Sequence, residues 1–424
     1  MKYKPTVYKL SNGVTVILDP MEIETTTVKI CFETGARDES PQEYGITHFC
    51  EHMMGRGTKN FPTKKSIDDY IEEHGGMRNA ATGYSALVFR GKILPENVNI
   101  LINMFGEQIR ESLFLPNKID LERPVIIDEL RSLMDNPEEQ LGYFISDKLF
   151  GGATLCYRTV GNIENIMSFT REQMLDWLAR RLSARNCIIC ISGRILNQAN
   201  VLKCLERNFK FLPDKDVSVN TKIIYTPKII HNIRPYEKNV KLRILFPDIW
   251  NQTYENLYNQ KCVNKFESFM SRRLYRVLRY ENGLVYGFSG ASIGNEHYNW
   301  SGFGTETSCD TIGRAVALIA KTAHEFYENP KIVQNDLNRL SCQNKLFFAD
   351  FLESAEARSR TLISFYYDFG RLYNYRDAIE MSSRITVEDV IEKSRGYFDG
   401  AMSIVTQGNV FKDDLESIWK ENFK

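Results

Sequence analysis

The sequence predicts an α+β fold made of two homologous domains, each a sheet with helices on one side. The chain has 424 residues, of which 43% are hydrophobic and 25% charged, so it can bury two sizeable cores. Strand-like segments mix with amphipathic helical segments in both halves, which is typical of a sheet packed against helices. In addition, the second half repeats segments of the first.

The repeat is clearest in a helix that leads to an apolar strand. Residues 169–172 lead through a helical stretch to the strand-like run 186–193, and residues 385–388 lead in the same way to 401–408. The two strands end 215 residues apart (408 − 193). Duplication of half the chain is the simplest explanation.

The duplication sets the expected domain boundaries. We expect an N-terminal domain at 1–211 and a homologous C-terminal domain at 229–424. The polar stretch 212–228 between them has the composition of a linker.

The N-terminal domain contains a metal-binding motif, His48-Phe-Cys-Glu-His52, which holds two of the six histidines. Residues four apart lie about one turn apart on the same helical face, so both imidazoles can reach one ion. Glu51 points into the same space and can serve as a base. Ser40 and Glu43 form a capping box with Pro41 between them, which predicts that this helix begins near residue 41.

A catalytic zinc takes three protein ligands and leaves one position open, so a third ligand must come from elsewhere. Glu129 is the candidate, with 76 residues between it and His52 (129 − 52 − 1). Asp128 could compete, but adjacent helical residues diverge by about 100°, so only one of them can face the ion. Glu122 lies two turns before Glu129 and could hydrogen-bond a ligand imidazole. Pro124 between them can kink the helix.

These motifs resemble the inverzincin metallopeptidases, the group of pitrilysin, insulin-degrading enzyme and mitochondrial-processing peptidase. The resemblance runs through nearly the whole chain, and the segments that carry it are 10–16, 45–58, 75–82, 122–130 and 279–286.

The resemblance implies a zinc endopeptidase with one Zn²⁺ per chain. It assigns His48, His52 and Glu129 as ligands and Glu51 as the base. Further implied roles are a hydrogen bond from Glu122 to a ligand, substrate binding by Asn79 and Ala80, and contacts of Arg279 and Tyr286 with the substrate carbonyl or oxyanion. One chain resembles half of a clam-shell chamber, so a homodimer is expected to complete each active site in trans.

The C-terminal copy is expected to bind no zinc. The strand beginning at Val28 matches the one beginning at Val240, an offset of 212 (240 − 28). Projected by this offset, His48, Glu51 and His52 become Gln260, Val263 and Asn264. We therefore expect the second copy to serve substrate binding.

Charge and apolar runs exclude several other partners. Lys plus Arg equals Asp plus Glu, so nothing indicates nucleic acid or an anionic membrane. No run of eighteen apolar residues and no leader pattern is present, which predicts a protein that is cytoplasmic or already processed. The nine cysteines predict free thiols in a reducing compartment. Cys187 and Cys190 have redox or zinc spacing, yet they lie in a strand-like run where residues three apart face opposite sides, which favours buried structural thiols.

Three functions are compatible with these residues. A zinc endopeptidase for extended peptides or presequence-like segments is favoured because every expected ligand and base position is filled. The alternatives are a non-catalytic assembly subunit and a substrate-presenting subunit of a processing-peptidase-like complex. Zinc is the default for a His/His/Glu site over manganese or cobalt, and no residue identifies the physiological substrate.

Overall fold

A computed structural model describes residues 3–151, 159–219, 224–294, 299–328, 331–410 and 414–423. The chain forms two compact units. The first comprises Met1–Tyr143, Gly152–Lys222 and Asp350–Tyr373, and the second Phe144–Gly151, Ile223–Ala349 and Asn374–Lys424. The units therefore differ from the continuous halves expected at 1–211 and 229–424, because a segment of each half belongs to the other unit.

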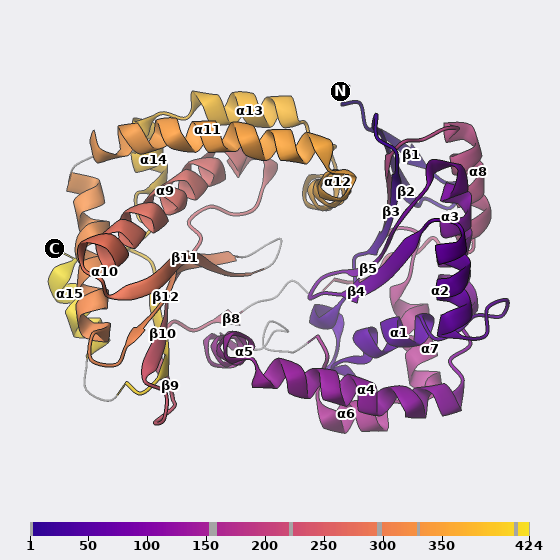
Figure 1. Ribbon diagram of the computed structural model, residues 1–424, viewed down its shortest axis with the longest axis horizontal. Helices are drawn as coiled ribbons and strands as arrows, with labels where there is room; N and C mark the ends of the chain where they lie inside the picture. Colours follow the sequence, from indigo (N-terminus) through magenta and orange to yellow (C-terminus); the bar gives the residue numbers. More distant parts are fainter. Residues whose placement is uncertain are drawn as a thin grey trace. The chain divides into compact units, whose positions relative to one another are not determined.

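The first unit contains a six-stranded sheet in the order β1-β2-β7-β3-β5-β4 (Figure 1). Its strands are β1 (Thr6–Lys9), β2 (Thr15–Pro20), β3 (Thr26–Phe32), β4 (Met77–Thr82), β5 (Leu87–Ile93) and β7 (Cys187–Gly193). Strands β2 and β7 are parallel, and the other neighbours are antiparallel. Strand β4 lies at an edge of this sheet.

The helices of the first unit come from both ends of the chain. They are α1 (Ile46–Met54), α2 (Lys64–Glu73), α3 (Val98–Glu111), α4 (Pro116–Asp135), α6 (Ile163–Ser168), α7 (Arg171–Arg181), α8 (Gln198–Phe209) and α12 (Ala355–Phe369), with short 3₁₀ turns η1 (Ala36–Asp38), η2 (Pro41–Glu43) and η3 (Pro95–Asn97). Helices α5 (Pro137–Leu149) and α11 (Lys331–Glu353) have residues in both units.

Both faces of the first sheet are covered, so the expectation of helices on one side is wrong for this unit. Strand β7 is buried along its whole length. Ile189 and Ile191 pack into the large core with the N-terminal helices, whereas Ile188 and Cys190 pack with Leu362 of α12. A strand without polar alternation needs cover on both faces, and α12 supplies the second layer (Figure 1). Cys187 and Cys190 lie on opposite faces of the strand, as predicted, and both are buried.

A buried ion pair fixes α12 to the sheet. Arg358 of α12 donates from Nε to Asp19 Oδ2 of β2 at 2.7 Å and also pairs through Nη2 with the other carboxylate oxygen. Both side chains are completely buried. The guanidinium also lies over the Tyr3 ring, 4.8 Å from its centroid.

The second unit repeats the sheet of the first. Its strand order, β11-β12-β10-β13-β9, matches β4-β5-β3-β7-β2, with the same parallel pair at β9 and β13. The strands are β9 (Ile229–Ile233), β10 (Asn239–Pro247), β11 (Val285–Gly294), β12 (Asn299–Ser308) and β13 (Ser403–Gly408). Strands β6 (Phe150–Gly151) and β8 (Ile224–Tyr225) form a separate two-stranded antiparallel sheet. The helical segments are η5 (Tyr254–Asn256), α9 (Leu257–Tyr275), the π-helix η6 (Arg276–Glu281), α10 (Ile312–Glu328), α13 (Tyr375–Arg384), α14 (Val387–Ser394) and α15 (Leu415–Asn422).

The registers of the two sheets correct the offset of one strand. Thr27 pairs with Ser192 in the first sheet, and Lys241 pairs with Gln407 in the second. Since 407 − 192 is 215, Thr27 corresponds to Lys241, an offset of 214 rather than 212. Side chains alternate along a strand with a period of two, so this shift leaves the same faces buried.

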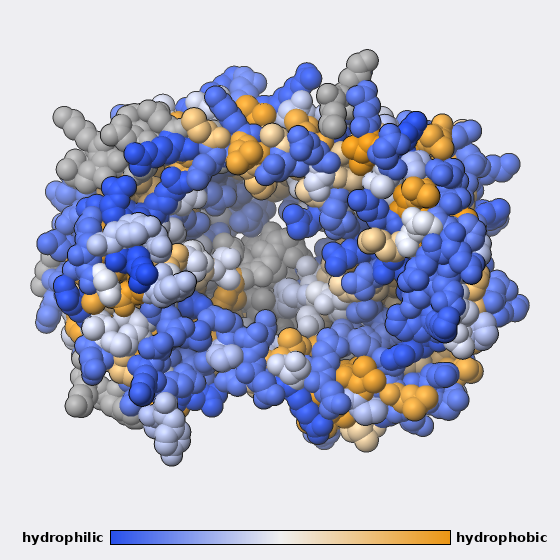
Figure 2. Space-filling view, viewed as in Figure 1, coloured by the Kyte–Doolittle hydropathy of each residue, from blue (hydrophilic) through white to orange (hydrophobic). Residues whose placement is uncertain are grey.

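The visible surface in Figure 2 is mainly hydrophilic, with apolar residues in separate small groups. Within the described residues, no helix has both the length and the apolar character needed to cross a lipid bilayer. The eight cysteines that the structure describes are free thiols.

Removing the partner of Asp19 tests the attachment of α12. We predict that Arg358→Met lowers the free energy of unfolding by about 3–5 kcal/mol, because it leaves a buried carboxylate without its cation. Arg384→Met is the matched control, since Arg384 forms an exposed pair with Glu380 and should cost less than about 1 kcal/mol. Urea denaturation measures both. Equal effects of the two substitutions would show that the buried pair does not hold this helix.

Candidate metal centre

Helix α1 carries the motif but begins later than predicted. Ser40 and Glu43 do form the expected hydrogen bonds, with Ser40 N and Oγ donating to Glu43 Oε2 at 3.1 and 2.7 Å. They close only the short turn η2, because Gly45 then adopts a left-handed conformation with φ of 92°. A side chain at Gly45 would also collide with the Val160 carbonyl oxygen. The helix therefore begins at Ile46.

The buried carboxylate of Glu39, which no sequence motif indicates, caps α1. Glu39 accepts hydrogen bonds from the backbone N–H groups of Gly45 at 2.7 Å and Thr47 at 2.9 Å. These donors lack partners within the helix, so the carboxylate stabilises its first turn. Burial raises the pKa of Glu39 to about 7 against the opposing hydrogen bonds from Thr47 and Gly45. Glu39 lies six and eight residues before its donors, outside the spacing of a capping box.

The structure brings His48, His52 and Glu129 together. His48 Nε2 lies 3.6 Å from Glu129 Oε1, and His52 Nε2 lies 3.5 Å from Glu129 Oε2. A tetrahedral zinc with ligands at about 2.1 Å has its ligand atoms about 3.4 Å apart, so these three side chains fit the ion. Across the described ranges, no other group of three or more His, Cys, Asp or Glu residues is placed to hold a metal.

Helix α4 presents Glu122 and Glu129 on one face, two turns apart. Glu122 Oε1 lies 2.8 Å from His52 Nδ1, and its other oxygen pairs with Arg56. This contact leaves Nε2 of His52 free to face Glu129. Pro124 lies inside α4 without ending it, and its exposed position places the lost hydrogen bond toward solvent. Asp128 is turned away, with its side chain 72% exposed and paired with Arg131.

The charges of this cluster stabilise one another. Hydrogen bonds from His48 and His52 hold the pKa of Glu129 far below its usual range. Burial lowers the pKa of His52, but its hydrogen bonds with Glu122 and Glu129 outweigh this effect and raise the value to about 9. The cluster therefore has a carboxylate that stays ionised and an imidazole oriented by a second carboxylate. His48 Nδ1 has no hydrogen-bond partner among the described residues.

Glu51 lies beside this group, where Thr82 Oγ1 of β4 donates to its Oε2 at 3.2 Å. Asn79 and Ala80 lie earlier on the same edge strand. Along β4 the burial alternates, with Arg78, Ala80 and Thr82 on the more buried face. Thr82 was not identified from the sequence, because only the register of the fold places it next to Glu51.

Arg279 and Tyr286 form a pair of their own in the second unit. The guanidinium carbon of Arg279 lies 5.2 Å from the centroid of the Tyr286 ring. Arg279 Nη1 donates to the Val285 carbonyl at 3.1 Å, and the tyrosine is 86% exposed. This arrangement leaves the phenol available to another molecule.

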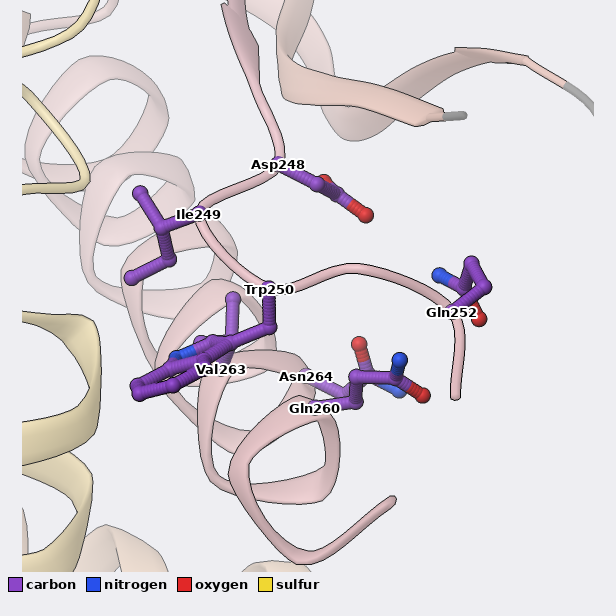
Figure 3. A pocket seen from close by; sticks show the side chains of 7 residues that line it. All are labelled: Asp248, Ile249, Trp250, Gln252, Gln260, Val263 and Asn264. Atoms are coloured by element: carbon purple, nitrogen blue, oxygen red, sulfur yellow. The ribbon is translucent and has the colours of Figure 1, made fainter. Parts of the chain in front are cut away.

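The second unit has a pocket where the projection placed the metal motif. Its volume is about 200 Å³, and Gln260, Val263 and Asn264 line it together with Asp248, Ile249, Trp250 and Gln252. In Figure 3 the two amides of α9 lie close together below Asp248. The described lining contains neither histidine nor glutamate, so this pocket lacks the ligand set of the first unit.

Two sequence profiles match the chain. The profile of insulinase, peptidase family M16, covers residues 15–161, and that of the peptidase M16 inactive domain covers 168–341. The chain belongs to peptidase family M16. This M16 chain is 25% identical to an uncharacterized zinc protease of Rickettsia felis over 98% of its own length and 99% of that protein. It is 28% identical to the β subunit of the mitochondrial-processing peptidase of Dictyostelium discoideum over 50% and 45% of the two chains.

Solved structures share the M16 fold. A protease from Helicobacter pylori matches 96% of this chain and 100% of its own with a TM-score of 0.81 and 18% identity. The periplasmic protease PqqL from Escherichia coli matches all of this chain with 51% of its own, with a TM-score of 0.84 and 16% identity. The M16 chain described here thus has the fold of about half of that protease.

The pH dependence of stability tests the raised pKa of the buried Glu39 carboxyl group. Its pKa rises from an ordinary value of 4.5 to about 7 on folding, so between these pH values the folded state keeps a proton that the unfolded state has lost. Wild-type stability must then fall as pH rises through this window. We predict that Glu39→Gln becomes more stable relative to wild type by about 2–3 kcal/mol between pH 5 and pH 8.

Urea denaturation of both proteins at a series of pH values measures the difference. Glu43→Gln is the control, because its neighbours lower the pKa of Glu43 despite partial burial. Its relative stability should not rise over the same range. A Glu39→Gln difference that does not change with pH would contradict the assigned pKa.

Proposed function

We propose that the protein is a zinc-dependent endopeptidase that hydrolyses extended peptides or presequence-like segments. The single observation that carries this proposal is the intact cluster of His48, His52 and Glu129 with Glu51 beside it. Membership of family M16 supports peptidase chemistry, and the relatives named zinc proteases support zinc as the metal.

In the proposed mechanism His48, His52 and Glu129 hold the metal. When bound, zinc supplies a Lewis acid that polarises the scissile carbonyl and makes water acidic enough to attack near neutral pH. Glu51 accepts a proton from the attacking water and delivers it to the leaving amine. Glu122 keeps the proton on His52 Nδ1, so that Nε2 presents its lone pair to the site.

The edge strand β4 supplies the place for the substrate. Its outer side has no strand neighbour within the sheet, so an extended peptide can pair with the backbone at Asn79 and Ala80 as an added strand. Main-chain pairing of this kind selects extended segments over folded ones, whatever their side chains. We also propose that the site is enclosed in a chamber.

A non-catalytic assembly or substrate-presenting subunit is the second candidate. The match of residues 168–341 to the M16 inactive domain supports such a role for the C-terminal half, as does the amide-lined pocket in the second unit. The complete ligand set of the first unit favours catalysis for the chain as a whole.

We further propose that two chains form a homodimer and that Arg279 and Tyr286 of one chain complete the site of the other. Their exposure and mutual contact support a role toward another molecule. An arginine and a phenol hydroxyl can stabilise the oxyanion that forms at the substrate carbonyl.

Two substitutions separate the base from the ligand. We predict that Glu51→Gln retains zinc while kcat falls by about 10²-fold to 10⁴-fold, because only the proton acceptor is lost. Glu129→Gln should instead lose zinc, because a neutral amide replaces an ionised ligand. Metal analysis of the purified proteins, together with peptide cleavage assays, measures both effects. Loss of zinc from Glu51→Gln with retention in Glu129→Gln would reverse the assignment.

Complementation tests the dimer. We predict that a Glu51→Gln chain and an Arg279→Ala/Tyr286→Phe chain, each nearly inactive, regain about a quarter of wild-type activity when co-expressed. Random mixing makes half of the dimers mixed, and each mixed dimer joins one wild-type metal centre to one wild-type Arg/Tyr pair. Mixed dimers that form but remain inactive would show that each site is completed within one chain.

A further inference from the structure

A pocket of about 270 Å³ lies beside Glu51 and His52 and is lined along one side by Asn79 and Ala80 of β4. Three of its other lining residues are cationic, namely Arg56, Lys64 and Arg78. Gly55 also lines the pocket and adds no side chain to fill it. The carboxylates of Glu51 and Glu122 line it as well, so its three cationic side chains outnumber its anionic ones by one.

Not all of this positive charge is neutralised by the protein. Arg56 pairs with Glu122, which balances it. Lys64 Nζ and Arg78 Nη2, in contrast, share the single carboxylate of Asp68, each at 2.6 Å. Asp68 is not part of the pocket lining. Two cations with one anion leave a net positive charge on the wall formed by α2 and β4.

Arg78 gives an independent indication that an anion belongs here. Its side chain is only 9% exposed, and its Nε has no hydrogen-bond partner in the part of the chain that the structure describes. A buried guanidinium is stabilised when acceptors surround it, so a single carboxylate at Nη2 leaves this group short of partners. An oxyanion in the pocket would add a second negative charge beside this guanidinium.

The alternation of β4 connects this wall with the cleaved bond. Arg78 and Ala80 share the face of Thr82, and Thr82 contacts Glu51. A strand advances about 3.3 Å per residue, so Ala80 and Arg78 lie about 7 and 13 Å along the strand from Thr82. A peptide paired with β4 and cut beside Glu51 would therefore extend a side chain near the cut into the pocket.

We propose that this pocket selects substrates with an acidic side chain within three residues of the cleaved bond. The proposal rests on the peptidase function proposed above and narrows its substrates to extended peptides with an acidic residue near the cut, rather than basic presequence-like segments. A glutamate or aspartate would pair with Lys64 and Arg78, whereas a lysine or arginine would face the net positive wall. A neutral residue would fit the space without either effect.

A peptide series tests this selection. A neutral extended peptide whose cut site is mapped by mass spectrometry serves as the parent, and Glu, Gln or Lys is placed at each of three positions on either side of the cut. We expect Glu at one position or more to raise kcat/KM about tenfold over Gln, the scale of a hydrogen bond to a charged group, and Lys to lower it.

Variants locate the effect in the pocket. Lys64→Gln and Arg78→Gln should each reduce the Glu-over-Gln ratio to within about twofold. Lys65→Gln is the matched control, because Lys65 precedes Asp69 on α2 as Lys64 precedes Asp68, yet it does not line the pocket. It should keep the wild-type ratio. Lys64 is on the surface of α2, so its variant remains informative even if Arg78→Gln fails to fold.

The failures of the two proposals are distinguishable. Cleavage of the parent without preference for Glu, or a preference that survives in Lys64→Gln, would overturn the selection of acidic side chains by this pocket and leave the peptidase function intact. If no peptide is cleaved, the same peptides carrying a fluorescent label are tested for binding by fluorescence anisotropy. Tighter binding of the Glu peptides than of the Gln peptides, lost in Lys64→Gln, supports the proposed selection. Equal binding of the Glu and Gln peptides overturns it.

Discussion

The contact between α1 and α4 is the interaction on which the candidate site depends. On each helix the residues of the site are spaced by whole turns and so lie on one face. His48 and His52 are one turn apart on α1, and Glu122 and Glu129 are two turns apart on α4. Glu129 lies against both imidazoles, while Glu122 binds the far nitrogen of His52. One carboxylate thus completes a candidate ligand set, and the other fixes the orientation of one of its members.

The remainder of the first unit holds α1 in place for this contact. Gly45 allows the sharp turn before the helix, Glu39 satisfies its first N–H groups, and Thr82 reaches Glu51 from the edge strand. The central strands β3 and β7 behind them are buried on both faces, and α12 provides the second layer. The buried pair of Asp19 and Arg358 fixes that layer.

Local spacing made much of the site predictable from the sequence. The four-residue step between histidines and the seven-residue step between glutamates are properties of one helix each. The 100° divergence of neighbours shows that only one of Asp128 and Glu129 can face the imidazoles, and the choice of Glu129 came from the family resemblance. The repeated strand order also followed from the duplication. Long-range packing was not predictable in this way. The cap by Glu39 depends on a loop, the start of α1 on the left-handed Gly45, and the place of α12 on an ion pair between residues 339 positions apart.

The two units show how one fold supports different chemistry. Both have the same strand order, but the helix that carries imidazoles and a base in the first carries amides and an apolar side chain in the second. The proposed function therefore rests on a few side chains on a shared framework.

The most direct test of the account is metal analysis and peptide cleavage on one sample of purified protein, before and after chelation. The account predicts one zinc per chain, loss of cleavage when the metal is removed, and recovery when one equivalent of zinc is returned. Protein that binds no metal, or cleavage that continues unchanged in metal-free protein, would contradict it.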